Sequence, residues 1–152
     1  MSDTITFTIQ GDSEGFVTFE CPFCSSEFKL KASEYQCEKE PIEELFCPYC
    51  GLTKGLSNFF STEVREHINA LVYNYMAETL NKSFGKMSRS TNRSKGLIKI
   101  TYKPLKKISI NELKDKDTTE AEFKCTCCEH STKVLYCAGV SKIFCPYCGV
   151  DI

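Results

Sequence analysis

Eight of the 11 cysteines in this 152-residue chain fall into four Cys-x-x-Cys pairs. Such a pair places two thiols on one tight turn, where both can bind the same metal ion. A secreted disulfide framework normally has an even number of cysteines without such close pairs. The spacing therefore favours metal ligation in a reducing compartment, and we expect a cytoplasmic protein. The four pairs are Cys21 and Cys24, Cys47 and Cys50, Cys125 and Cys128, and Cys145 and Cys148.

Two of these pairs lie in an identical hexapeptide. The sequence Phe-Cys-Pro-Tyr-Cys-Gly occurs at residues 46–51 and again at residues 144–149. Proline after the first cysteine presets φ for a turn, and glycine after the second permits a positive φ. We call each Cys-x-x-Cys turn a knuckle, and we expect its two thiols to face one point.

The distances between knuckles indicate two separate metal sites. Cys128 and Cys145 are separated by 16 residues, within the spacing of structural zinc sites. Cys24 and Cys47 are separated by 22 residues, which is slightly longer than that spacing and indicates a larger connecting loop. Four thiolates without water make a closed, structural site.

In these segments the chain resembles the zinc-ribbon superfamily, over about Phe16–Leu52 and Phe123–Val150. The resemblance implies two structural zinc ions. It does not imply one function, because ribbons serve as binding modules, scaffolds and enzyme appendages. The knuckles also resemble those of rubredoxins, which hold iron, and a tetrahedral sulfur site admits either metal. The implied ligands are Cys21, Cys24, Cys47 and Cys50 for one ion, and Cys125, Cys128, Cys145 and Cys148 for the other.

The pattern around the knuckles predicts a small α+β protein. Each half has a strand, a knuckle, a hairpin and the repeated hexapeptide, so we expect two four-cysteine zinc-ribbon β-units related by internal duplication. One amphipathic helix and a basic loop would join them. Strands are expected at residues 4–9, 16–20, 27–31 and 97–102, with the first two forming a hairpin, and a short strand near residues 108–110. The expected segments are 1–58 (first ribbon), 59–85 (helix), 86–96 (basic linker) and 97–152 (second ribbon).

The helix is predicted over residues 62–82, with Ser61 or Thr62 as its N-cap. Apolar residues recur on one face at helical spacing, and polar residues cluster on the opposite arc. This face could pack on the ribbons, pair with a second copy or dock on another protein. The apolar face comprises Val64, Ile68, Leu71, Val72, Tyr75, Met76 and Leu80, and the polar arc Glu63, Glu66, His67, Asn74 and Glu78.

Charge is strongly segregated along the chain. Residues 1–78 have a net charge of −8, residues 79–111 of +9 and residues 112–152 of −2. A basic stretch without acids attracts phosphate backbones, although it can also pair with acidic protein surfaces. We therefore predict nucleic-acid binding by residues 82–107, with a protein-interaction adaptor or small subunit of a larger complex as the alternative. The candidate contacts are Lys82, Lys86, Arg89, Arg93, Lys95, Lys99, Lys103, Lys106 and Lys107.

The sequence does not predict an enzyme, a membrane protein or a secreted protein. We find no Walker loop, Gly-x-Ser-x-Gly, His-Glu-x-x-His or deaminase motif, so the prediction is a non-enzymatic protein without a small-molecule substrate. His67 and His130 are expected at the surface or beside a site. The sequence shows neither a membrane-length apolar run nor a secretory signal. Cys37, Cys127 and Cys137 remain either small buried apolar residues or extra ligand or redox thiols.

Overall fold

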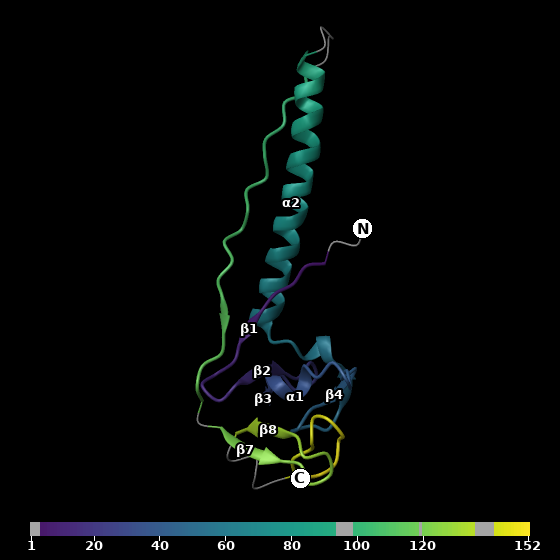
Figure 1. The fold of residues 1–152 in the computed structure, drawn as a ribbon, viewed down its shortest axis with the longest axis vertical. Coiled ribbons are helices and arrows are strands. Elements are labelled where there is room, and N and C mark those ends of the chain that lie inside the picture. Colours follow the sequence, from purple (N-terminus) through teal and green to yellow (C-terminus); the bar gives the residue numbers. More distant parts are fainter. Residues whose placement is uncertain (1–3, 94–98, 119, 136–141) are drawn as a thin grey trace. The chain divides into compact units, whose positions relative to one another are not determined.

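The computed structural model describes residues 4–93, 99–118, 120–135 and 142–152, and it confirms a small α+β fold. The helices are α1 (Ala32–Tyr35), the 3₁₀ helix η1 (Leu56–Phe59) and α2 (Thr62–Arg93). The strands, labelled where space allows in Figure 1, are β1 (Ile9–Gln10), β2 (Phe16–Glu20), β3 (Glu27–Lys31), β4 (Glu44–Phe46), β5 (Thr53–Gly55), β6 (Leu113–Lys114), β7 (Ala121–Lys124) and β8 (Ser131–Val134).

The chain divides into two compact units. Unit 1 comprises residues 1–7 and 66–111, and unit 2 comprises residues 8–65 and 112–152. This grouping differs from the four segments predicted from the sequence. Unit 2 holds residues 8–58 of the predicted first ribbon and 112–152 of the predicted second, whereas residues 1–7 and 99–111 fall in unit 1.

Unit 2 is built on one antiparallel sheet with the strand order β2-β3-β8-β7. The hairpin β2–β3 surrounds the first knuckle, and the hairpin β7–β8 surrounds the third. Strands β3 and β8 join them, with Lys29 opposite Lys133 and Leu30 opposite Thr132. The two predicted ribbons therefore share a single sheet.

The core of unit 2 lies against one face of this sheet and includes the first cysteines of two knuckles, Cys21 and Cys47. Alternation along β2 and β3 places Val17, Phe19, Phe28 and Leu30 on one face of the sheet. The aromatic rings of Phe19, Phe28 and Phe59 pack in a chain, with centroids about 6 Å apart. The fully buried core residues are Val17, Phe19, Cys21, Phe28, Leu30, Leu45, Cys47, Phe59, Val134 and Ile143.

A buried charge cluster lies beside the sheet. The Lys29 ammonium contacts Asp12 Oδ2 at 3.0 Å, and both side chains are almost fully buried. Lys29 also donates to the Lys116 carbonyl at 2.6 Å, and Asp12 Oδ1 accepts from the Phe16 N–H at 2.9 Å. These bonds satisfy charges that would otherwise be costly to bury.

Several predicted strands are wrong. Only Ile9 of the expected strand 4–9 lies in a strand, and β1 pairs in parallel with β6 rather than forming a hairpin with β2. Residues 99–111 contain no strand, and positions 97 and 98 lie outside the described residues. The backbone of residues 99–111 bonds instead to side chains of α2, as described below.

Helix α2 begins as predicted but ends later. Ser61 Oγ accepts from the Val64 N–H at 3.4 Å, which fits a cap. The helix continues to Arg93, so the expected end near Lys82 and the expected linker over residues 86–93 are wrong. Gly85 costs about 1 kcal/mol relative to alanine in a helix but does not force an end. Contacts on both sides of Gly85 hold the last turns: Phe84 stacks on Tyr102, and Ser88 Oγ donates to the Ile100 carbonyl at 2.9 Å.

In unit 1, the segment 99–111 runs along α2 (Figure 1), and we call it the extended segment. Asn74 donates to the Ile108 carbonyl at 2.8 Å and accepts from the Ile108 N–H at 2.7 Å. Asn81 makes the same two bonds to Leu105, each at 2.9 Å. Each carboxamide thus replaces the partner strand that an extended backbone would otherwise require.

The extended segment therefore covers the side of α2 that carries Asn74 of the predicted polar arc, together with Ala77 and Asn81. Ala77, one turn from Asn74 and Asn81, is buried, whereas Val72, Tyr75, Met76 and Leu80 of the predicted apolar face are exposed. The sequence prediction missed this because asparagine was treated as a solvent-facing residue. Within the described residues, no helix combines the length and apolar character needed to cross a membrane.

Candidate metal centres and basic face

Four knuckles with the same backbone geometry carry the predicted ligands. In each, the first cysteine's N–H donates to the carbonyl five residues later, and its carbonyl accepts from the N–H four residues later, at 2.7–3.0 Å. The residue after the second cysteine has a positive φ: 58° at Ser25, 71° at Gly51, 62° at Glu129 and 71° at Gly149. This common turn aims both thiols of a pair to one side.

The first and second knuckles bring four thiols together. Cys21 Sγ lies 3.7 Å from Cys50 Sγ, and Cys24 Sγ lies 3.6 Å from Cys47 Sγ. All four sulfur atoms lie within 4.8 Å of one another. A tetrahedral zinc ion with Zn–S bonds of about 2.3 Å requires sulfur–sulfur distances of about 3.8 Å. The residues therefore fit a tetrahedral metal ion.

The third and fourth knuckles form an equivalent cluster. Cys125 Sγ lies 3.7 Å from Cys148 Sγ, and Cys128 Sγ lies 3.5 Å from Cys145 Sγ. Backbone N–H groups point at the first thiol of three knuckles, at 3.4 Å in Cys21, 3.4 Å in Cys47 and 3.3 Å in Cys125. Such N–H groups stabilise thiolates. The two clusters confirm the predicted grouping of the ligands and are zinc-ribbon-like.

The thiols differ in acidity. Burial raises the pKa of Cys21, Cys47 and Cys145, and it raises the pKa of Cys128 to about 11. Burial also acts on Cys24, but hydrogen bonds from Ser26 outweigh it and lower the pKa of Cys24 to about 7. Each cluster thus contains at least two thiols that hold protons at neutral pH, and a metal ion must displace them.

Reciprocal backbone bonds connect the two repeated hexapeptides. The Phe46 N–H donates to the Pro146 carbonyl at 2.8 Å, and the Phe144 N–H donates to the Pro48 carbonyl at 2.9 Å. Equivalent atoms therefore meet across an approximate two-fold relation, which is compatible with the predicted duplication. The two metal centres are parts of one packed structure.

The tyrosine of each hexapeptide also packs within unit 2. Tyr49 donates from its hydroxyl to the Glu27 carbonyl at 2.9 Å, and it accepts from the Leu135 N–H at 3.1 Å. Tyr147 stacks on His130, with ring centroids 4.3 Å apart. His130 therefore packs beside the second cluster and is not one of its ligands.

Three cysteines remain outside the two clusters. Cys37 and Cys127 are exposed, so the interpretation of these two as buried apolar residues is wrong. Cys137 lies outside the described residues. Among the described residues, no other group of His, Cys, Asp and Glu side chains is arranged to hold a metal ion.

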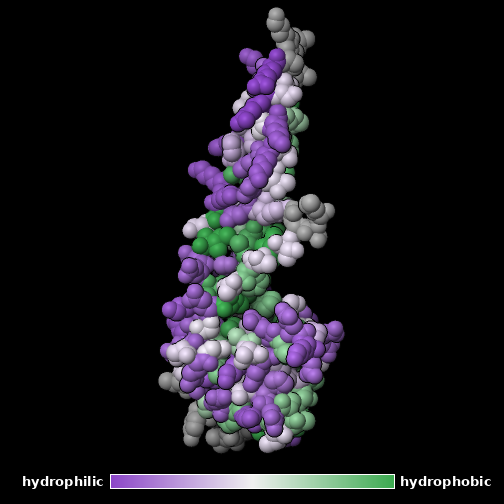
Figure 2. Space-filling model, viewed as in Figure 1, coloured by the Kyte–Doolittle hydropathy of each residue, from purple (hydrophilic) through white to green (hydrophobic). Residues whose placement is uncertain are grey.

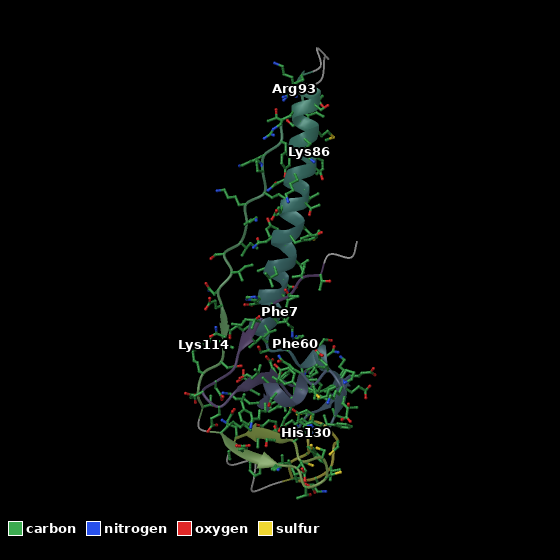
Figure 3. The ribbon with its side chains drawn as sticks, in the orientation of Figure 1. Phe7, Phe60, Lys86, Arg93, Lys114 and His130 are labelled. Carbon is green, nitrogen blue, oxygen red and sulfur yellow. The ribbon has the colours of Figure 1, made fainter. Side chains whose placement is uncertain are left out.

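The basic candidates fall on two elements of unit 1. Lys82, Lys86, Arg89 and Arg93 recur at i, i+4, i+7 and i+11 of α2, which places them on one side of the helix. We call these four residues the basic face. Sequence reasoning missed it because residues 86–96 were expected to be a linker, although the helical spacing was present. Lys86 and Arg93 mark this half of α2 in Figure 3.

The extended segment adds further bases beside α2. Lys107 and Lys82 both contact Glu78, at 3.0 and 2.7 Å, and the pKa of Glu78 falls to about 2 through these bonds. A groove of about 380 Å³ lies between the two elements and is lined by Lys82, Lys86, Arg89 and Lys107 among others. Lys99, Lys103 and Lys106 are exposed, and Lys95 lies outside the described residues. Figure 2 shows hydrophilic side chains gathered along this part of the molecule.

Comparisons with known proteins identify no relative. No family model, curated protein or solved structure matches the chain. The class is therefore defined by the structure itself: a small α+β protein with two tetracysteine sites.

Proposed function

We propose that the chain is a non-enzymatic protein with two structural zinc ions that binds nucleic acid through unit 1. The zinc assignment is supported by two closed sets of four thiols at tetrahedral spacing. The nucleic-acid assignment rests on the basic face. Four cations lie on one side of α2 without an acidic residue between Glu78 and the helix end.

The geometry of the basic face suits a phosphate backbone. From Lys82 to Arg93 it is about 16 Å long, at 1.5 Å per helical residue. Lys86, Arg89 and Arg93 have no ion-pair partner among the described residues, whereas Glu78 partly neutralises Lys82 and Lys107. Cations on a regular surface contact phosphates without reading bases, so we expect binding that depends on salt more than on sequence.

Binding is tested by fluorescence anisotropy with duplex and single-stranded DNA and RNA over a salt series. We expect the variant Lys86→Glu/Arg89→Glu/Arg93→Glu to lose at least tenfold in affinity. Its slope of log affinity against log salt should fall by about 2 to 3, which corresponds to three lost phosphate contacts.

A matched control carries the same change in charge outside unit 1. Lys39, Lys114 and Lys124 are exposed residues of unit 2, and Lys39→Glu/Lys114→Glu/Lys124→Glu should leave both affinity and slope near wild type. Equal losses in the two variants would indicate a general charge effect and would contradict the proposed site.

The zinc assignment has its own measurement. Elemental analysis of protein kept reduced throughout should find two zinc ions per chain. Iron in their place, or fewer than two ions, would contradict this part of the proposal.

A further inference from the structure

The side of α2 away from the basic face carries a row of exposed apolar residues. Tyr73, Met76, Leu80, Phe84 and Met87 are between 38% and 55% exposed. Their spacing of three or four residues places them on one side of the helix, over about 21 Å at 1.5 Å per residue. We call them the apolar stripe. A contiguous exposed apolar surface on a folded chain commonly marks an interaction site.

The stripe is symmetric about its central residue. Tyr73 and Met87 lie seven residues before and after Leu80, and Met76 and Phe84 lie four residues before and after it. In an antiparallel helix pair with two-fold symmetry, residues at equal distances on either side of the axis meet, so this spacing places apolar residues opposite apolar residues. We propose that two copies of this chain associate through antiparallel α2 helices, with the two-fold axis at Leu80.

The side chains that would meet are chemically matched. Antiparallel pairing about Leu80 brings Tyr73 to Met87 of the partner subunit and Met76 to Phe84 of the partner subunit. Both contacts join a thioether to an aromatic ring, which is favourable beyond the burial of apolar area. Phe84 is already oriented, because its ring stacks on Tyr102 with centroids 5.4 Å apart.

The distribution of charge along α2 favours the antiparallel direction over the parallel one. The two-fold axis sets residues 82–93, which hold the four cations of the basic face, against residues 67–78 of the partner subunit. The stretch 67–78 contains Glu78 and neither lysine nor arginine. A parallel pair would instead place the two 82–93 stretches side by side. At 3.6 residues per turn, the basic face lies almost opposite the stripe, so pairing leaves it accessible.

The association is tested on the full-length zinc-loaded chain by sedimentation velocity. The wild-type chain should be dimeric at tens of micromolar. Leu80→Glu places two carboxylates on the axis and should give a monomer with unchanged helicity and zinc content. Lys86→Glu is the matched control on the other side of the helix and should remain dimeric. A monomeric wild-type chain, or a dimeric Leu80→Glu variant, would overturn the proposal.

A charge-pair variant tests the direction and register. Met76→Lys and Phe84→Glu alone should each weaken the dimer, because each introduces unpaired charges at the interface. The double variant Met76→Lys/Phe84→Glu should restore it, because each lysine then faces a glutamate of the partner subunit. Parallel helices would face like charges at both positions, so a double variant that stays monomeric would overturn the antiparallel arrangement. These measurements do not involve nucleic acid and are independent of the proposed function.

Discussion

The ring of Phe46 lies directly against Gly149, where a Cβ atom would be 2.9 Å from two ring carbons. The equivalent pair is Gly51 and Phe144, with a Cβ-to-ring distance of 3.1 Å. The last residue of each hexapeptide, a glycine, thus contacts the first residue of the other hexapeptide, a phenylalanine. This contact, together with the backbone bonds between them, joins the two metal centres.

Alanine at Gly149 or Gly51 is therefore expected to destabilise unit 2. Both glycines have a φ of 71°, where a side chain costs about 1–2 kcal/mol, and the new methyl group must also displace the ring. Gly15→Ala is the control, since Gly15 has a φ of 82° but no atom within 4 Å of its Cβ position. Thermal unfolding of the zinc-loaded proteins should give lower midpoints for Gly149→Ala and Gly51→Ala than for Gly15→Ala. Equal midpoints would show that the ring contact contributes nothing.

Loss of one metal centre should weaken the other. The sheet β2-β3-β8-β7 spans both hairpins, so unfolding around the first cluster removes support from the second. We expect Cys24→Ser to leave one zinc ion per chain, with its affinity reduced at least tenfold in competition with a chromophoric chelator. Cys37→Ser changes an exposed non-ligand and should retain two ions at wild-type affinity. An unchanged second site in Cys24→Ser would mean that the centres are independent.

Metal affinity should rise steeply with pH. The raised pKa values of Cys21 and Cys47 keep these thiols protonated at neutral pH, as do those of Cys128 and Cys145 in the second cluster. Each cluster therefore releases at least two protons when it binds zinc, and each proton contributes about a tenfold change in apparent affinity per pH unit. Chelator competition between pH 6 and 7.5 should show at least a hundredfold gain per unit. A tenfold gain or less would contradict the displacement of two protons.

Asp12→Asn should be strongly destabilising, because it leaves the buried Lys29 ammonium without its counter-charge. Removing one partner of a buried ion pair typically costs about 3–5 kcal/mol, measurable by urea unfolding. Glu78→Gln breaks only exposed ion pairs and should change stability little. A similar small effect for Asp12→Asn would show that Lys29 finds another partner.

Asp12 should also make the free energy of unfolding depend on pH. Burial of Asp12 acts to raise its pKa, but hydrogen bonds from Phe16, Lys29 and Glu14 outweigh it, and the pKa is lowered from the ordinary value of 3.8. Its contribution is therefore complete above that ordinary value and is lost as the pH falls through the lower folded-state pKa. The difference in unfolding free energy between wild type and Asp12→Asn should shrink at acidic pH only below about pH 4.

The extended segment should loosen when its asparagine contacts are removed. Asn81→Ala deletes two hydrogen bonds to Leu105, each contributing about 0.5–1.5 kcal/mol. Hydrogen exchange at the Leu105 amide should accelerate about tenfold or more, with smaller changes at Ile108. Thr79→Ala removes a hydroxyl that donates within the helix, to the Tyr75 carbonyl, and should leave Leu105 protected. Unchanged exchange in Asn81→Ala would contradict the role of this side chain.

The ligand sets were determined by sequence alone. A Cys-x-x-Cys pair with suitable flanking residues forms its turn from local bonds, and the resemblance to zinc ribbons grouped Cys21 and Cys24 with Cys47 and Cys50. The strands β2 and β3 were also predictable, because alternation is a local pattern. The start of α2 followed from a local cap at Ser61.

Tertiary structure alone decided how these parts combine. Lys29 and Lys133 are about one hundred residues apart, and no local pattern indicates that β3 and β8 pair. The length of α2 depended on contacts such as Phe84 with Tyr102, which outweigh the weak helix preference around Gly85. Asn74 and Asn81 resemble solvent-facing residues in sequence, yet their carboxamides bind the backbone of Ile108 and Leu105. In each case the deciding interactions join residues distant in sequence, and folding is what brings them together.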